Sequence, residues 1–215
     1  FDDYGQLLKL EGTPLFAGWV QKLGKASNHQ VLSFNWFQGH RHMLTNTPVK
    51  VPADLKGVRV RTPGAPVWLE TVRAMGATPT GMPWSEVYSA LQTKVIDGAE
   101  AQHPAVYGAR LYEVVKIITK TEHIYLITGI VTSRAWFDKL PADQQAILGE
   151  ESFAAGKWAS EATIASLADY EKKLREKGAT IVEIDKAPFK AATAGVYQTL
   201  GYSELRKEVD KALGK

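Results

Sequence analysis

The chain has 215 residues, of which 45% are apolar and 10% aromatic, and this composition excludes disordered and fibrous proteins. Lysine and arginine together number 26 against 23 acidic residues, and no run of five like charges occurs, so no nucleic-acid partner is expected. The chain contains no cysteine, which excludes disulfides, zinc-thiolate sites and thiol catalysis.

The first half of the chain predicts helices that alternate with strands. Val58, Arg59, Val60 and Arg61 alternate with period two, which places the valines on one face of a strand and the arginines on the other. This alternation of elements indicates an α/β architecture with a largely parallel sheet. The expected elements are a helix at 14–26, strands at 30–36 and 42–46 separated by a turn at Gln38-Gly39, a strand at 58–61, a helix at 65–75, a strand at 78–82, a helix at 84–94 and a strand at 95–100.

The second half predicts one helix that is much longer than the others. Residues 141–177 contain no proline after Pro141 and only two glycines, Gly149 and Gly156, both of which weaken a helix relative to alanine. Because a heptad repeat is not sustained, we interpret this helix as a spine packed across two lobes rather than as a coiled coil. The other expected elements are a helix at 104–114, a strand within 117–132, a strand at 180–184 and helices at 189–200 and 204–213.

No sequence pattern of a known catalytic site stands out. The chain lacks nucleophile-elbow, phosphate-loop, dinucleotide-binding and zinc-protease motifs. His40 and His42 could share one face of a strand and hold a metal, but no third ligand is evident, so structural histidines are the favoured interpretation. Asp97 and Glu100 could form an acid/base pair, although no nucleophile or metal accompanies them. We therefore expect neither a catalytic residue, nor a metal site, nor a cofactor.

Arg61 is the most informative polar residue, because it ends a strand immediately before a Pro-Gly turn. Open α/β sheets bind ligands at the carboxyl ends of their strands, and a guanidinium can hold a carboxylate by two parallel hydrogen bonds. A solvated arginine at the sheet edge is the alternative interpretation. Trp84 could cap a ligand pocket at this edge, or it could be a core tryptophan at the start of a helix.

Several long motifs in this sequence resemble those of one protein family. Residues 54–64, DLKGVRVRTPG, resemble the D-L-K-G-[LVM]-[KR]-[IVL]-R-x-P signature of TRAP transporter solute-binding proteins, the DctP-type extracytoplasmic receptors. Two further motifs of that family are similar to residues 76–92, GATPTGMPWSEVYSALQ, and to residues 95–100, VIDGAE. With Trp136 to Pro141 and the long helix that follows, the resemblance covers essentially the whole chain.

The resemblance implies a fold and a division of the chain. The implied fold is α/β, a two-lobe periplasmic binding protein architecture with a long helix spanning both lobes. Family members carry a substantial amino-terminal segment before the position of Phe1, and the chain also starts without methionine or a signal segment. We therefore expect an incomplete first lobe, in a chain that is processed, truncated or incompletely described. The expected division is 1–38 for the remnant of lobe I, 39–126 for lobe II, 127–166 for the return to lobe I, and 167–215 for the completion of lobe II.

The resemblance also implies a set of ligand-binding residues. Arg61 would form the salt bridge to a ligand carboxylate, Arg41 would be a second cation, and Trp84 would wall the cleft beside Glu100. After Glu100, sialic-acid-binding members continue with Asn and Pro, whereas here Ala101, Gln102 and His103 precede Pro104. This departure argues against sialic acid and favours a smaller or more apolar carboxylate. The selectivity residues expected on this basis are Gln102, His103 and Tyr125.

The expected function is that of a periplasmic receptor, not an enzyme. Such a receptor would capture a small organic acid in an interlobe cleft and deliver it, as a monomer, to the membrane subunits of a TRAP transporter. Two alternatives remain at this point. One is a small-molecule hydrolase or lyase that uses Glu100 and His103 as an acid/base pair, and the other is a fragment that binds nothing. Turnover of added acids would favour the enzyme, and binding without turnover would favour the receptor.

Overall fold

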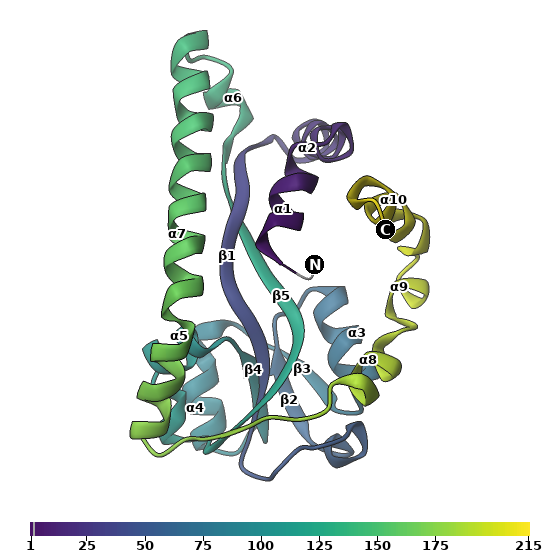
Figure 1. Ribbon diagram of the computed structural model, residues 1–215, viewed down its shortest axis with the longest axis vertical. Helices are drawn as coiled ribbons and strands as arrows, with labels where there is room; N and C mark the ends of the chain where they lie inside the picture. Colours follow the sequence, from purple (N-terminus) through teal and green to yellow (C-terminus); the bar gives the residue numbers. More distant parts are fainter. Residues whose placement is uncertain (2) are drawn as a thin grey trace. The chain divides into compact units, whose positions relative to one another are not determined.

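The structure is a computed structural model that describes residue 1 and residues 3–215. Its helices and strands fall into two compact units (Figure 1). Unit 1 comprises 1–38, 126–165 and 203–215, and unit 2 comprises 39–125 and 166–202. The elements are α1 (Tyr4–Glu11), α2 (Pro14–Ser27), β1 (His29–Thr45), β2 (Arg59–Thr62), α3 (Pro66–Ala74), β3 (Thr78–Gly81), α4 (Val87–Gln92), β4 (Gly98–Ala101), α5 (His103–Gly108), β5 (Ile117–Ser133), α6 (Arg134–Phe137), α7 (Ala142–Glu176), β6 (Thr180–Val182), α8 (Ala187–Thr193), α9 (Val196–Thr199) and α10 (Ser203–Leu213), with short 3-10 helices at Pro52–Leu55, Trp84–Glu86 and Leu111–Glu113.

The sheet combines parallel pairs with an antiparallel one, and its strand order is β3-β2-β4-β1-β5-β6. β2 pairs in parallel with both β3 and β4, and β5 pairs in parallel with β6, as strands connected through helices do. β1 instead pairs with β4 in the antiparallel sense, with His42 opposite Ala101. The expectation of a largely parallel sheet is therefore wrong at its centre.

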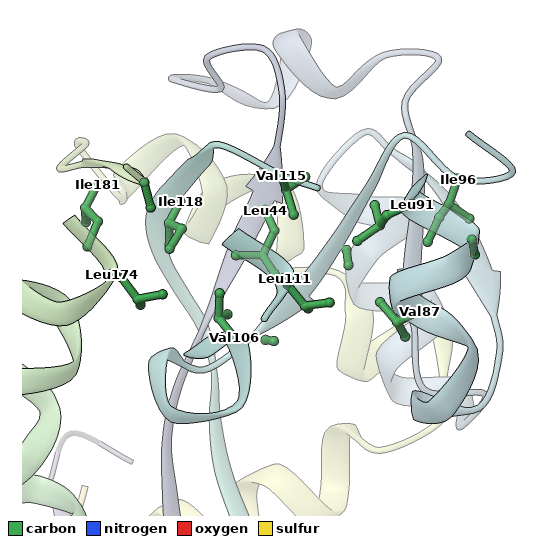
Figure 2. Close-up of a cluster of buried hydrophobic side chains, with 14 residues drawn as sticks. Leu44, Val87, Leu91, Ile96, Val106, Leu111, Val115, Ile118, Leu174 and Ile181 are labelled. Carbon is green, nitrogen blue, oxygen red and sulfur yellow. The ribbon is translucent and has the colours of Figure 1, made fainter. Parts of the chain in front are cut away.

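Unit 2 contains two hydrophobic clusters on opposite faces of its strands. Along β1, Met43 and Leu44 point to opposite faces because side chains alternate in a strand. Leu44 joins the cluster formed with α4, α5 and the start of β5, whose side chains Figure 2 shows converging. Met43 joins the other cluster, where Val60 of β2 meets Val72 of α3 and Phe189 of α8. These two layers hold the carboxyl ends of β2, β3 and β4 in place.

Unit 1 is built around its own helices and the outer halves of β1 and β5. Asp3 caps α1 by accepting a hydrogen bond from the backbone N–H of Gln6 at 2.9 Å. Leu7 and Leu10 are buried on one side of α1, a spacing that predicts a helix, but α1 was not among the expected elements. α10 packs against α1 and α2, and Lys9 Nζ donates to the carbonyl of Leu213 at 2.7 Å. Residues 203–215 thus belong with unit 1, which corrects their expected place in the second lobe.

The expected turn at Gln38-Gly39 is wrong, because β1 is one continuous strand of 17 residues. Gly39 has φ +111°, a conformation that side chains disfavour, so the glycine that suggested a turn serves instead inside a strand. The boundary between the units in β1 falls immediately before Gly39. The chain also passes from one unit to the other within β5, after Tyr125, and within α7, after Ala165.

Two expected helices are interrupted by local backbone geometry. The expected helix at 104–114 consists of α5 and a 3-10 turn, because Arg110 adopts a left-handed conformation with φ 56°. The expected helix at 84–94 begins as a 3-10 turn and becomes α-helical only at Val87. The long helix is confirmed, since α7 runs for 35 residues, and β5 confirms the strand expected within 117–132.

The two glycines of α7 differ in what surrounds them. A Cβ added at Gly149 would meet no atom within 4 Å, whereas one at Gly156 would lie 2.2 Å from Asn35 Oδ1 and 2.9 Å from Trp36 Nε1. Beside this contact, the hydroxyl of Ser160 donates to the carbonyl of Asn35 at 2.7 Å and accepts from the N–H of Phe37 at 2.8 Å. Gly156 is therefore required by the close approach of α7 to β1 within unit 1.

We expect Gly149→Ala to raise the free energy of unfolding by about 0.5–1 kcal/mol, because alanine is the better helix former and has room. Gly156→Ala is expected to lower it by about 1–3 kcal/mol, because the added methyl group overpacks the contact with β1. Urea denaturation of the parent and of the two variants, monitored by circular dichroism, gives the free energies of unfolding to be compared. Equal effects of the two substitutions would contradict the packing role of Gly156.

Candidate functional site

The polar residues singled out by the sequence gather at the carboxyl ends of β2 and β4 in unit 2. Arg61 lies opposite Ala99 in the parallel pair of β2 with β4, and Thr62 and Glu100 follow them. The hydroxyl of Thr62 donates to Glu100 Oε1 at 3.0 Å, so these two side chains share a sheet face. Because side chains alternate along a strand, Arg61 projects from the opposite face of the same edge.

Arg41 and Glu100 form a buried ion pair across β1 and β4. Arg41 Nε donates to Glu100 Oε2, and Nη2 donates to Oε1 at 2.6 Å and to the Glu100 backbone carbonyl. Nη1 donates to Gln102 Oε1 at 3.0 Å. Glu100 is completely buried and Arg41 is 5% exposed, so the charge of Arg41 is neutralised within the protein.

His123 of β5 completes the surroundings of Glu100. Its Nε2 lies 3.4 Å from Glu100 Oε2, and its Nδ1 lies 2.7 Å from the hydroxyl oxygen of Thr121. Burial raises the pKa of the Glu100 carboxyl, but the hydrogen bonds and charges of His123 and Arg41 outweigh burial and hold this pKa below its ordinary value. Glu100 is therefore an ionised carboxylate held between two basic side chains.

Arg61 is buried without an acidic partner. Its Nε and Nη2 both donate to the carbonyl of Met82, at 3.0 and 2.8 Å, and Nη1 makes no hydrogen bond within the described part of the chain. Burial lowers the pKa of Arg61, the charge of Glu100 raises it, and that of Arg41 lowers it further. Because an arginine stays protonated in proteins, this edge of the sheet carries one uncompensated buried cation with a free donor end.

Each of the two arginines lies against an indole ring. Arg61 Cζ is 5.3 Å from the ring centroid of Trp84, and Arg41 Cζ is 4.8 Å from that of Trp68, both within cation-π range. Trp84 is 39% exposed, so it is not a core tryptophan. Trp68 lies in α3 and Trp84 begins a 3-10 helix. The chain segments that lead to them approach closely at glycines, since a Cβ at Gly81, the end of β3, would lie 3.3 Å from Gly64 Cα.

The two histidines considered as a metal pair have different neighbours. The ring of His42 packs against that of His103 with centroids 4.4 Å apart, whereas the ring of His40 meets that of Tyr125 at 5.0 Å. Nδ1 of His42 and Nε2 of His103 are buried without hydrogen-bond partners. No group of three or more His, Asp or Glu side chains placed to hold a metal ion occurs among residue 1 and residues 3–215.

The pair of His42 and His103 makes stability sensitive to acid. Burial lowers the pKa of His103 to about 4, and burial with the neighbouring charge of His103 lowers the pKa of His42 well below its ordinary value. Below about pH 6.5 the unfolded chain binds protons that the folded chain does not. The stability contributed by neutral His103 is therefore present above about pH 6.5 and is lost as the pH falls towards 4.

We expect the free energy of unfolding to fall between pH 6.5 and 4.5 with a slope of up to ~1.4 kcal/mol per pH unit for each such histidine. In His103→Gln this slope should be smaller by the contribution of one histidine, up to ~1.4 kcal/mol per pH unit. His29→Gln, which removes an exposed histidine of unit 1, should leave it unchanged. Chemical denaturation at several pH values gives the slopes, and identical slopes in all three proteins would exclude His103 as their source.

The structure brings some of the expected site residues together and separates others. Arg41, Glu100 and Gln102 form one hydrogen-bonded group, and Arg61 with Trp84 forms a second group. The ring of His103 packs against that of His42, and the ring of Tyr125 packs against that of His40. Glu100 pairs with Arg41 rather than with His103, and Asp97 pairs with Arg59 at the surface. The geometry thus gives neither acid/base pair, Glu100 with His103 or Asp97 with Glu100, any support.

Sequence reasoning missed four contributors to this region: Thr62, Trp68, the carbonyl of Met82, and His123. Thr62 and Met82 lie within or beside the quoted motifs, and alternation along β2 could have placed Thr62 on the face of Glu100. His123 comes from β5, and only the pairing of distant strands brings it to Glu100. No local signal in the sequence indicates that contact.

Comparison with known proteins identifies the family. The profile of the bacterial extracellular solute-binding proteins, family 7 (DctP), matches residues 1–204. The chain belongs to this family. Membership confirms the resemblance seen in the motifs, and it places the chain in the periplasm, where its named relatives are found. Within the described residues, no helix combines the length and the apolar character needed to cross a membrane.

Solved members of the DctP family share the fold of this chain. A TRAP periplasmic solute-binding protein from Escherichia fergusonii, in an apo open structure, is 47% identical with a TM-score of 0.87, and the match covers 99% of this chain and 72% of that one. A second, from Ochrobacterium anthropi with bound L-fuconate, is 32% identical with a TM-score of 0.94, covering 99% of this chain and 71% of that one. The α/β binding-protein fold is thus confirmed.

Among curated DctP-family relatives, the 2,3-diketo-L-gulonate-binding periplasmic protein YiaO of Escherichia coli (strain K12) is 32% identical over 183 residues. The match covers 84% of this chain and 56% of that protein. The chain spans about half the length of the curated relatives it matches.

Proposed function

We propose that this chain is the receptor of a TRAP-type secondary transporter, which binds a small organic acid through its carboxylate at Arg61 and delivers it to the membrane subunits without catalysing a reaction. The observation that carries this proposal is the state of Arg61. It is 4% exposed, has no acidic side chain within ion-pair distance in the described residues, and keeps Nη1 free. A buried charge without a partner is costly, so a ligand carboxylate is the complement that this site lacks.

The environment of Arg61 favours a carboxylate over other anions. The carbonyl of Met82 occupies the edge formed by Nε and Nη2, which leaves the edge formed by Nη1 and Nη2 to face a ligand. That edge offers two parallel donors, the geometry that matches the two oxygens of a carboxylate. Trp84 lies beside the guanidinium with an exposed ring that can cover the carbon chain of a small acid.

The ligands of relatives agree with this chemistry. The related protein from Ochrobacterium anthropi holds L-fuconate, and YiaO is named for 2,3-diketo-L-gulonate, and both compounds are organic acids. We extend this class, a carboxylate with further oxygen functions, to the present chain. Arg61, Met82 and Trp84 all come from one chain, so the proposed site needs no partner subunit, and we propose that the receptor acts as a monomer.

A ligand panel tests the proposal. We expect L-fuconate, L-galactonate, succinate or L-malate to raise the melting temperature, because a ligand at a hundred times its Kd stabilises the native state by about 2.7 kcal/mol. The corresponding amides or methyl esters should have no effect, since they lack the charged carboxylate. Nuclear magnetic resonance of the acid after overnight incubation should show it unchanged. Stabilisation by an ester equal to that by its acid, or conversion of the acid, would refute this function.

A further inference from the structure

Glu122 of β5 has a backbone conformation that is unusual inside a strand. Its φ is 47°, in the left-handed region, and of the non-glycine residues that the structure describes it is the only one inside a helix or strand with a positive φ. Gly39 of β1 also has a positive φ, but it has no Cβ to strain. The conformation of Glu122 therefore costs free energy that the surrounding structure must offset, as is common for strained residues near functional sites.

Lys186 binds the side chain of Glu122. Its Nζ forms an ion pair with Glu122 Oε2, and the two side chains are only 33% and 28% exposed. A partly buried pair of this kind is screened less than a fully exposed one. Lys186 immediately precedes α8, whose Phe189 is buried in the same cluster as Met43. The ion pair thus ties Glu122 to a well-packed part of unit 2.

Glu122 separates two residues whose side chains meet. Thr121 and His123 flank it, and the hydroxyl oxygen of Thr121 lies 2.7 Å from Nδ1 of His123. The other ring nitrogen of His123, Nε2, lies 3.4 Å from Oε2 of the fully buried Glu100. A left-handed residue interrupts the extended backbone of a strand and re-aims the side chains beside it, as β-bulges do next to active sites. His123 is the side chain that a change at Glu122 would turn.

We propose that Glu122 is a positioning residue, whose left-handed backbone, held by the ion pair with Lys186, keeps the ring of His123 against Glu100. The conformation determines which residues can replace Glu122. Glycine adopts a positive φ without strain and needs no anchor, whereas valine, which is branched at Cβ, is strongly disfavoured there.

The position of His123 matters for the proposed ligand site at Arg61. Burial lowers the pKa of Arg61 and the charge of Glu100 raises it, so this negative charge is felt at Arg61. The same charge repels a carboxylate bound by Arg61, and His123 together with Arg41 compensates it. A displaced His123 therefore weakens acid binding. This last step rests on the proposed function, but the position of His123 in the ligand-free chain does not.

Substitutions at both ends of the ion pair test this assignment. Glu122→Gly keeps the left-handed conformation without the ion pair, and Glu122→Val opposes that conformation. Lys186→Met removes the anchor and is made in the parent and in Glu122→Gly. Glu183→Val is the matched control, because Glu183 also pairs with a lysine, Lys120, but has no positive φ. The readouts are the proton–nitrogen correlations of the His123 ring in nuclear magnetic resonance of the ligand-free chain, assigned with His123→Gln, and calorimetric titration with L-fuconate, L-galactonate, succinate and L-malate.

We expect Glu122→Gly and Glu183→Val to leave the His123 signals unchanged and acid binding within about twofold of the parent. Glu122→Val should move these signals and raise the Kd at least about fivefold, the lower end of energetic coupling between sites. Lys186→Met should move the His123 signals in the parent and not in Glu122→Gly, and this comparison decides the question if Glu122→Val does not fold.

Three results overturn the inference: His123 signals that move in Glu122→Gly, His123 signals that stay unchanged in a folded Glu122→Val, or an equal effect of Lys186→Met in both backgrounds. A parent that binds none of the four acids overturns the proposed function instead. The His123 signals of the ligand-free variants then still decide the role of Glu122, so the two failures are distinguishable.

Discussion

Replacing Arg61 with lysine is expected to weaken organic-acid binding by about 1.5–3 kcal/mol, roughly a 10- to 150-fold increase in Kd. Lysine keeps the positive charge but loses the planar pair of donors that faces a carboxylate. Lysine also cannot hold the carbonyl of Met82 through two nitrogens, as Arg61 does, and still offer donors to the proposed ligand. Titration calorimetry of Arg61→Lys with the tightest acid of the panel measures the loss.

Arg59→Lys is the matched control for this experiment. Arg59 lies on the same strand, two residues earlier, but it is exposed and its guanidinium pairs with Asp97. We expect Arg59→Lys to leave acid binding within twofold of the parent, and both variants to keep their melting temperatures without ligand within a few degrees. Binding by Arg61→Lys that matches the parent, or a collapse of its stability, would show that Arg61 is structural rather than a ligand clamp.

Glu100→Gln is expected to lower the free energy of unfolding by about 3–5 kcal/mol, because it leaves the buried charge of Arg41 without its counter-ion. The carboxylate of Glu100 accepts hydrogen bonds from Arg41 and Thr62 in a fully buried position, 3.4 Å from His123 Nε2, and glutamine offers only one accepting oxygen in place of two. Equilibrium unfolding in urea, monitored by tryptophan fluorescence, measures this change.

Asp97→Asn provides the comparison for Glu100→Gln at the surface. The side chains of Arg59 and Asp97 are 46% and 40% exposed, and exposed ion pairs contribute about 0–1 kcal/mol. Asp97→Asn should accordingly cost no more than that. Similar losses of stability in Glu100→Gln and Asp97→Asn would mean that breaking the buried ion pair of Arg41 with Glu100 costs no more than breaking the exposed pair.

Local sequence patterns predict one part of this site and not the rest. Arg61, Thr62 and the following Pro-Gly turn lie in one continuous motif, so the strand end and its guanidinium could be predicted from the residues themselves. The pairing of Arg41 with Glu100 joins residues 59 positions apart. The family resemblance implied that both are ligand-binding residues, but it did not indicate that they bind each other. Whether a cation is free or neutralised depends on such a contact, which periodicity does not predict.

The sequence by itself determined the family, the order of most strands and helices, the length of α7 and the position of Arg61 at a strand end, because alternation, capping residues and contiguous motifs act over a few neighbouring residues. The tertiary structure decided that β1 continues through Gly39, that α10 joins unit 1, that Gly156 is a packing glycine, and that Glu100 lies between Arg41 and His123. Each of these outcomes depends on atoms far apart in the chain, whose packing and charge pairing override the local preferences of the residues involved.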